Sequence, residues 1–413
     1  MRVPALVLGL VCCAWHANSQ IVKMPSESNR DALLAAIPVQ ATASFPAVAI
    51  DPAGNVIVAW TQGITAYTKL YLHRWRGGAW EALASPAPGG GVDGARGEAL
   101  VSSLALDSAG NPAIAWQDRS MGANAIYFRR WDGSTWQELE GSASSGGVSM
   151  TTTGYSGFPS LALDSRGLPV VAWEEHYGSR ADIYVRRYER RLLKQGWEDV
   201  GDHPGVVGFQ SKLSEAIQPA LRLNPQGRPS VAWLDSETGP KQVYFRRWNG
   251  SRWEELAGSA TQGGVSRSRE VAASVDMELD AEANPILSWK EGSGPGATAV
   301  VKHWNGKQWE SMGETAAAPG VDPTWPRLAL DAQRRPVLAY RAEDKIHVRR
   351  WTGTVWEMLG SANWHNPHVN HRPDERQFAL AAGADKVCAA WIEEGDSPAL
   401  QVACFRLGSS GEH

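Results

Sequence analysis

Hydrophobic and polar positions follow one pattern that recurs seven times between residues 45 and 407. Each copy begins with a short apolar run, breaks at a polar turn that usually carries Gly, and continues with a second apolar run that ends in an aromatic residue. Such runs separated by turn residues predict an antiparallel hairpin. The aromatic ends lie 51 to 60 residues apart, a spacing typical of repeat architectures. They are Trp60, Trp116, Trp173, Trp233, Trp289, Tyr340 and Trp391.

A second hairpin follows in each copy. Five copies carry two Trp five residues apart around a Gly-containing tip, as in RRWDGSTW. Asp-Gly and Asn-Gly tips predict a two-residue type I′ turn, because both central residues need positive φ. The third copy replaces the tip with the longer and more basic residues 189–196, which include Arg190, Arg191 and Lys194.

Four short antiparallel strands in each of seven copies predict an all-β fold, a seven-bladed β-propeller of four-stranded blades. The predicted blades span approximately 45–83, 100–139, 157–200, 217–256, 273–312, 325–359 and 375–407. The seventh copy stops after its third strand, so an N-terminal strand from the lead-in 20–44 should complete it and close the ring. Residues 20–24 are the best candidate. The alternative, an open stack of repeats, would leave unpaired strand edges.

The first 19 residues have a basic start, an apolar run and a small-residue site, which predict a secretory signal peptide. The mature chain is therefore expected to be secreted or periplasmic, and residues 408–413 form a tail. Two Cys fall in the signal, and Cys388 and Cys404 lie on consecutive predicted strands joined by a tight turn. An oxidising compartment favours a disulfide between them, and two small buried thiols are the alternative.

The chain has 413 residues, 20% charged, and a formal net charge of −4. This balance gives no field that would attract nucleic acid, and no apolar run is long enough to span a membrane. The composition is therefore that of an ordinary globular protein. The sequence predicts no cofactor and does not determine the oligomeric state.

The patterns LALDSxGxPxVAW and IYxRRWxGxxWxxLG resemble Trp-rich β-propeller repeats of exported bacterial proteins over residues 45–407. The WDGSTW-type hairpin is also similar to blades of the fucose-binding propeller lectins. That second resemblance implies sugar held between neighbouring blades by an Arg, an acidic side chain and a Trp. The spacing around Asp164 does not match a sialidase Asp-box.

Pairing the second hairpin of the second copy across Asp132-Gly133 predicts that Arg129 faces Trp136. Because side chains alternate along a strand, Arg129, Trp131 and Trp136 should share one face. The same pattern in other copies extends this candidate ligand-binding set to Arg246, Trp248, Trp253, Lys302, Trp304, Trp309, Arg349, Trp351 and Trp356. On the opposite face, Arg74, Arg247 and Arg350 should lie diagonally from Glu81, Glu254 and Glu357.

These repeated pairs permit two interpretations. They can stabilise the hairpins as cross-strand ladders, or they can bind glycans as several weak equivalent sites. We predict from them an exported, non-enzymatic binding or scaffold propeller whose leading ligand is a glycan. A protein–protein interaction platform is one alternative, and a propeller glycoside hydrolase or lyase is the other.

Two further groups of residues could carry chemistry. His365, His368 and His371 fall within seven residues, which could bind a transition metal, although no Cys or carboxylate pattern accompanies them and a solvated loop is favoured. An enzyme would need a non-repeated set of catalytic groups, such as two carboxylates. Asp93, Asp276 and Asp322 break the repeat, but the sequence brings no pair of them together, and no nucleophile-elbow or zinc-hydrolase motif is present.

Overall fold

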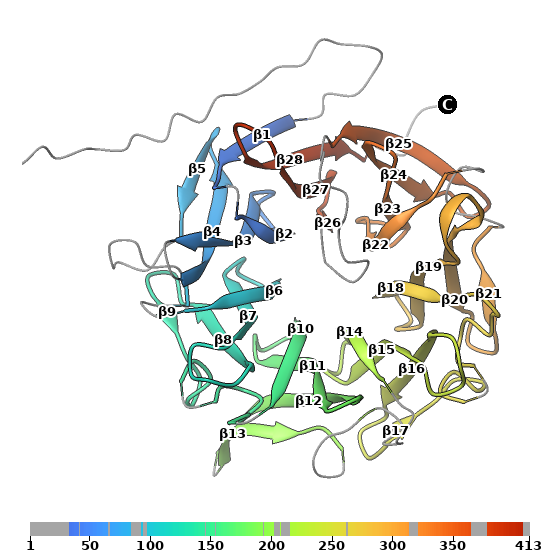
Figure 1. Ribbon diagram of the computed structural model, residues 1–413, viewed down its shortest axis with the longest axis horizontal. Coiled ribbons are helices and arrows are strands. Elements are labelled where there is room, and N and C mark those ends of the chain that lie inside the picture. The colour runs from blue at the N-terminus through green and yellow to red at the C-terminus, as the bar shows by residue number, and fades with distance from the viewer. Residues whose placement is uncertain are drawn as a thin grey trace, which may run out of the picture.

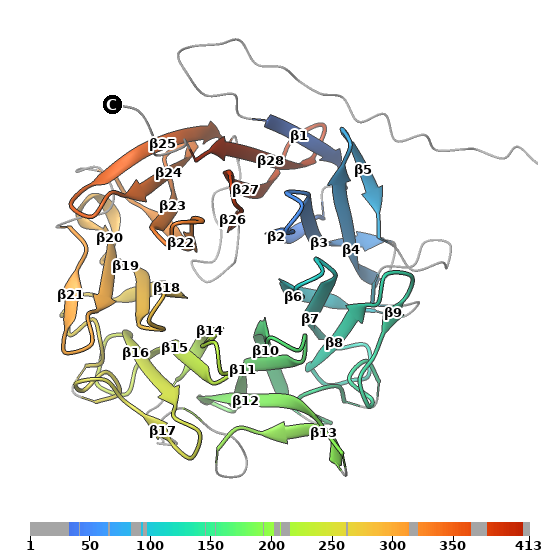
Figure 2. The ribbon, with the colours of Figure 1, turned by 180° about the vertical axis from the view of Figure 1, so that it is seen from behind.

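The computed structural model describes residues 33–40, 42–64, 67–83, 92–93, 97–144, 146–152, 154–192, 194–201, 207, 215–261, 263–313, 321–364 and 378–407. These residues form seven four-stranded antiparallel sheets arranged as blades in a closed ring (Figure 1). Figure 2 shows the same ring from behind, with β2, β6, β10, β14, β18, β22 and β26 nearest its centre. The predicted seven-bladed propeller is confirmed.

The strands are consecutive along the chain in the first six blades. Blade 1 contains β2 (Ser44–Ile50), β3 (Val56–Ile64), β4 (Tyr67–Arg76) and β5 (Ala79–Ala82). Blade 2 contains β6 (Ala99–Leu106), β7 (Pro112–Asp118), β8 (Ala125–Trp131) and β9 (Trp136–Gln137). Blade 3 contains β10 (Tyr155–Leu163), β11 (Pro169–Tyr177), β12 (Arg180–Arg191) and β13 (Lys194–Asp199).

The second half of the ring follows the same order. Blade 4 contains β14 (Ile217–Leu223), β15 (Pro229–Asp235), β16 (Gln242–Trp248) and β17 (Trp253–Glu254). Blade 5 contains β18 (Ala272–Leu279), β19 (Pro285–Glu291), β20 (Thr298–Trp304) and β21 (Trp309–Ser311). Blade 6 contains β22 (Thr324–Leu330), β23 (Pro336–Ala342), β24 (Lys345–Trp351) and β25 (Trp356–Asn363). The only helix among the described residues is the short 3-10 turn Gly294–Gly296, and no described helix is long and apolar enough to cross a membrane.

Blade 7 joins the two ends of the chain. Its strands β26 (Phe378–Ala382), β27 (Lys386–Glu393) and β28 (Ala399–Arg406) are completed by β1 (Leu33–Pro38), which pairs antiparallel with β28 (Figure 1). An N-terminal strand therefore closes the ring as predicted, but it is not residues 20–24, which lie outside the described residues. Residues 20–24 contain β-favouring Ile and Val, whereas β1 reads LLAAIP, which favours helix. Pairing with the free edge of β28 overrides that local preference.

The disulfide is confirmed and lies in this closing blade. Cys388 on β27 and Cys404 on β28 face each other in register, and their sulfur atoms are bonded. Cys404 also pairs with Leu33 of β1, so the bond lies beside the strand that closes the ring.

Replacing both cysteines with Ser should destabilise the protein by about 3 kcal/mol, the value expected for a cross-link that closes a loop of about 15 residues in the unfolded chain. Cys388 and Cys404 are separated by 16 positions. Urea unfolding of the variant and of the oxidised wild type measures the difference. Equal midpoints for the two proteins would show that the cross-link contributes nothing to stability.

Antiparallel order gives the ring two different rims. The turns between first and second strands and between third and fourth strands lie together on one rim, which we call the turn rim; residues 164–168 and 132–135 are examples. The turns between second and third strands and the connections between blades lie on the other, which we call the connection rim; β10 begins there and β11 ends there.

Buried indoles fill the space between the blades. Trp116, Trp173, Trp233, Trp289 and Trp391, each near the end of a second strand, are all almost fully buried. Their Nε1–H groups donate to acidic residues two positions on, as Trp173 does to Glu175 at 2.8 Å and Trp391 to Glu393 at 3.0 Å. The acidic residue two positions after each Trp thus provides a hydrogen-bond acceptor for the buried indole N–H, which would otherwise have none.

The tips of the second hairpins differ from the predicted two-residue turn. In blade 2, Trp131 pairs with Trp136 and Arg130 with Gln137, so four residues form the loop and Arg129 does not face Trp136. Asp132 causes the difference, because its carboxylate accepts the backbone N–H groups of Ser134 and Thr135 and closes a wider turn. Asn249 and Asn305 do the same in blades 4 and 5. In blade 1 the tip holds two residues, Gly77 and Gly78, which both have positive φ, and Trp75 pairs with Trp80 as the corresponding Trp residues do in blade 2.

Candidate active site

The repeated Arg and Trp side chains connect neighbouring blades. Arg129 Nη1 donates to the Val92 carbonyl at 2.7 Å, and Trp136 Nε1 donates to the Leu83 carbonyl at 2.7 Å, both in the stretch that leads from blade 1 to blade 2. The shift in register by two residues keeps Arg129, Trp131 and Trp136 on one face, as predicted.

The same contacts recur around the ring. Arg246 and Lys302 donate to the carbonyls of Val207 and Val265. The indoles of Trp253, Trp309 and Trp356 donate to the carbonyls of Val200, Leu256 and Met312. Each of these Trp packs against the first Trp of its own hairpin, namely Trp248, Trp304 or Trp351, with ring centroids 5.3 to 5.7 Å apart. Arg349 pairs in register with Met358, and its Nε has no partner among the described residues.

On the opposite face, the Arg–Glu pairs lie directly across from each other instead of diagonally. Arg74 contacts Glu81 at 2.6 Å, Arg247 contacts Glu254 at 2.7 Å, and Arg350 contacts Glu357 at 3.0 Å. Each is a partly exposed pair that contributes roughly 0.2–1 kcal/mol.

His73 of β4 occupies the position that Arg129 has in blade 2, and it gives the protein a pH-dependent stability. The ring lies edge-on to Trp60 at 5.0 Å, and burial lowers the pKa of His73 from 6.5 to about 4. As the pH falls from 6.5 toward 4, the unfolded chain therefore takes up a proton that the folded chain does not. Stability is present in full above pH 6.5 and is lost below it, by about 3 kcal/mol at pH 4.

His73→Phe should remove this dependence while keeping an aromatic ring against Trp60. Urea midpoints at pH 7 and pH 4.5 measure it, and the drop between the two pH values should be smaller in the variant than in the wild type. An identical drop in both proteins would assign the acid sensitivity to other groups.

The remaining predicted candidates do not form a site among the described residues. His365, His368 and His371 lie outside them, and no group of three metal-ligating side chains is present within the described ranges. Asp93 pairs with Lys69 at 3.4 Å, and Asp322 pairs with Lys290 at 2.5 Å. Burial raises the pKa of Asp93, and its Oδ1 also accepts the Leu70 N–H. Each acid is therefore committed to a partner of its own.

Asp276 belongs to a charged cluster on the inner strands of blades 4 and 5. Arg222 Nε and Nη2 both donate to Glu278 Oε1, at 3.0 and 2.8 Å, and Arg222 Nη2 lies 3.6 Å from Asp276. Asp276 Oδ2 also accepts the Leu328 N–H of blade 6 at 2.9 Å. Glycosidases need one carboxyl group kept protonated and one free to attack. Here one guanidinium contacts both carboxylates, so the two acids share a charged partner and the geometry does not set one apart as acid and the other as nucleophile.

A different group of non-repeated residues meets where β10 begins and β11 ends, on the connection rim of blade 3. Tyr155 and His176 face each other in register, and their rings meet edge to face with centroids 4.8 Å apart. His176 Nε2 lies 2.8 Å from Glu174 Oε1. The imidazole is 29% exposed and the Glu174 side chain only 4%, so a substrate could reach the ring but not the carboxylate.

Strand alternation explains why two adjacent acids have different environments. Glu175 points to the face of the blade that holds Trp173, and it accepts from that indole and from the Ser156 hydroxyl at 2.6 Å. Glu174 points to the face shared with His176, and its second oxygen accepts the backbone N–H of Gln218 in blade 4 at 2.8 Å. That contact fixes the carboxylate, which in turn orients the imidazole.

The contact with Glu174 sets the chemistry of His176. A carboxylate accepts, so Nε2 carries the proton and donates it, and Nδ1 keeps a lone pair. His176 is thus arranged as a general base.

The Tyr155 hydroxyl is arranged as a proton donor. Burial, and then the negative charge of Glu174, raise the pKa of Tyr155, while the Gln117 side chain partly offsets the rise. The phenol therefore keeps its proton at neutral pH. Gly157 makes room for it, because a Cβ there would come within 2.8 Å of the Tyr155 hydroxyl and 2.9 Å of the Gln117 amide oxygen.

Sequence analysis missed this group, although a signal was present. The residues that follow the second-strand Trp are Glu174, Glu175 and His176 only in the third copy, and no other copy has His at that place. The same copy also carries the insertion at residues 189–196. That insertion forms the extended β12–β13 hairpin on the turn rim, far along both strands from His176.

No family model matches the sequence, and no curated protein matches it. Solved structures do match. The polysaccharide lyase Uly1 has a TM-score of 0.55 at 9% identity, over 88% of this chain and 90% of that one. An ulvan lyase of polysaccharide lyase family PL25, bound to -[GlcA(1-4)Rha3S]-, has a TM-score of 0.55 at 13% identity, over 88% and 93%. The GH93 α-L-arabinofuranosidase of Fusarium graminearum has a TM-score of 0.49 at 12% identity, over 75% and 93%.

The likeness establishes a shared propeller fold. The comparisons also correct the prediction of a non-enzymatic binding or scaffold propeller, because these similar propellers are polysaccharide-degrading enzymes, which favours the enzyme alternative. The inter-blade hydrogen bonds agree with this correction, since they employ the polar atoms on which glycan binding by the hairpins would depend. A binding role for individual hairpin residues stays untested, as do the resemblances to Trp-rich exported repeats and to fucose-binding lectins.

Proposed function

We propose that this protein is a polysaccharide lyase that cleaves a uronic-acid-containing chain by β-elimination at the connection rim of blade 3. The observation that carries the proposal is the register pair of Tyr155 and His176, with His176 hydrogen-bonded to the buried Glu174. His176 provides an oriented base, and the protonated phenol of Tyr155 lies beside it. The other copies of the repeat do not have this pair.

β-Elimination needs these two proton transfers. Nδ1 of His176 removes the proton from the sugar carbon next to the carboxylate, and a C=C bond forms as the neighbouring C–O bond breaks. Tyr155 gives its proton to the departing sugar oxygen, so that no unstable alkoxide is released. Glu174 stabilises the imidazolium until solvent returns both side chains to their starting forms.

The comparisons support the choice of reaction. The two lyase structures reported above each have a TM-score of 0.55, and one of them holds a glucuronic-acid-containing oligosaccharide. The carboxylates of Asp276 and Glu278 share Arg222 as a partner, which argues against the hydrolytic alternative at this cluster. Export also fits, because a polysaccharide of this kind is met outside the cytoplasm and the disulfide needs an oxidising compartment.

Incubation of the purified protein with a panel of uronic-acid-containing and neutral polysaccharides tests the proposal with two readouts. A lyase produces new reducing ends together with ultraviolet absorbance from the conjugated C=C bond. Reducing ends without absorbance would assign hydrolysis instead. Failure to cleave any acidic polysaccharide in the panel would contradict the proposed function.

A further inference from the structure

An arginine on the turn rim of blade 2 lacks the partner that its equivalents have. The residue before the first hairpin Trp is Arg74, Arg247 or Arg350 in blades 1, 4 and 6, and each forms an ion pair with the Glu that faces it on the fourth strand. In blade 2 this residue is Arg130, and Gln137 faces it. Gln137 donates to Asp132 at 3.0 Å and to Thr135 at 2.6 Å. Within the described ranges, the Arg130 guanidinium forms no hydrogen bond or ion pair.

Arg130 lines a pocket of about 140 Å³ between blades 2 and 3. Ser165 and Arg166 from the turn of blade 3 lie on the other side of the pocket. One water molecule needs roughly 10–15 Å³ on this measure, so the space accommodates several waters or one small anion.

The other charged groups that line the pocket have partners other than Arg130. Asp107 also lines the pocket, but its carboxylate accepts the N–H groups of Ala109 and Asn111 and the Asn111 amide. Arg166 pairs with Asp164 at 2.7 Å and with Glu189 at 3.5 Å. Asp107 is therefore held by amide donors and Arg166 by two carboxylates, so Arg130 is the cation of the lining that no described carboxylate contacts.

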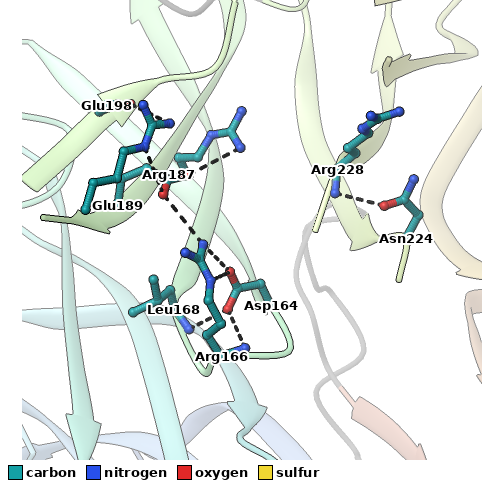
Figure 3. A network of polar contacts seen from close by, with 9 residues as sticks. Asp164, Arg166, Leu168, Arg187, Glu189, Glu198, Asn224 and Arg228 are labelled. Atoms are coloured by element: carbon teal, nitrogen blue, oxygen red, sulfur yellow. Dashed lines mark hydrogen bonds and ion pairs between the residues drawn. The ribbon is translucent and has the colours of Figure 1, made fainter. Parts of the chain in front are cut away.

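The neighbouring pocket between blades 3 and 4 shows how this position is otherwise filled. Figure 3 shows Arg187, the equivalent of Arg130, directed at Glu189, which also receives Arg166. Glu189 belongs to the extended β12–β13 hairpin of blade 3 and is buried. A carboxylate from the chain thus occupies the place beside Arg187, whereas no carboxylate of the described chain reaches Arg130.

We propose that the pocket beside Arg130 binds a small oxyanion, a carboxylate or a sulfate, which takes the place of the missing glutamate. The planar guanidinium presents paired N–H donors that match two oxygens of either group. The Ser165 side of the pocket adds polar surface. The site lies on the turn rim, opposite Tyr155 and His176, so it is independent of the proposed lyase activity.

Titration of the ¹⁵N-arginine-labelled protein with sodium sulfate or sodium acetate, at constant ionic strength set with chloride, tests the site. We expect one arginine Nε–Hε signal to shift and saturate, and that signal should be missing in Arg130→Gln. The anion that saturates at the lower concentration identifies the ligand as a sulfate or a carboxylate.

Gln137→Glu is the decisive variant because it keeps Arg130 and restores the ion pair of the other blades. It should lower the affinity for the anion that saturates the wild-type protein at least tenfold. The urea concentration at the midpoint of unfolding should not fall. Arg247→Gln, at the paired position of blade 4, is the matched control and should bind as the wild type does. A wild-type titration without saturation, or a Gln137→Glu variant that binds as tightly as the wild type, would overturn the proposal.

Discussion

Replacing His176 with Asn should lower kcat on an acidic polysaccharide by about 10²- to 10⁴-fold, the usual contribution of a positioned general base. Asn keeps a polar side chain that can donate to Glu174 but has no group that can take a proton at neutral pH. KM should change little, because proton transfer contributes to the transition state and not to binding of the ground state. Initial rates of C=C formation measure the effect.

The controls for this variant separate chemistry from folding. Tyr155→Phe should also lower kcat, since it removes the proton donor and keeps the ring contact with His176. His303→Asn is the matched control, because His303 contacts Asp280 at 2.8 Å on the turn rim with no part in the reaction. Its activity should equal that of the wild type. A His176→Asn variant with the wild-type kcat would show that His176 is not the general base.

Deleting residues 1–38 should destabilise the propeller by on the order of 5 kcal/mol relative to a chain that lacks only residues 1–32 and keeps β1. The longer deletion removes β1, which pairs with β28 over six positions and buries Ile37 against the last blade. It also exposes the edge of β28, which can then pair with another chain.

Thermal unfolding and light scattering of the two truncated proteins test this second prediction. The chain without β1 should unfold at a lower temperature and aggregate, and the chain that retains β1 should do neither. Equal behaviour of the two would mean that blade 7 does not need β1.

The periodic part of the fold could be predicted because it is repeated. Seven copies of alternating apolar runs fix the number of blades, and the hairpin position of Cys388 and Cys404 follows from the short turn between them. The closing strand could not be found in this way, since β1 has no counterpart in the repeat and its Leu and Ala residues do not favour a strand. Only the free edge of β28 selects it.

The hairpin register depended on one side chain. Whether the tip holds two residues or four is decided by Asp132 accepting two backbone N–H groups, a choice that Asp-Gly does not reveal by itself. In blade 2 that difference moved the predicted cross-strand pairs by two positions. The site residues were harder still, because Tyr155 and His176 are 21 positions apart and meet only through the pairing of β10 with β11. The repeat is most regular at the hairpin Trp residues, whereas the proposed catalytic residues lie where the repeat is broken.

Mass spectrometry of the products formed from an acidic polysaccharide by the wild type and by His176→Asn tests the central claim most directly. We expect wild-type products that carry an unsaturated uronic acid and are lighter by one water than hydrolysis products, and almost no such products from the variant. Saturated products, or unsaturated products formed equally well by His176→Asn, would contradict it.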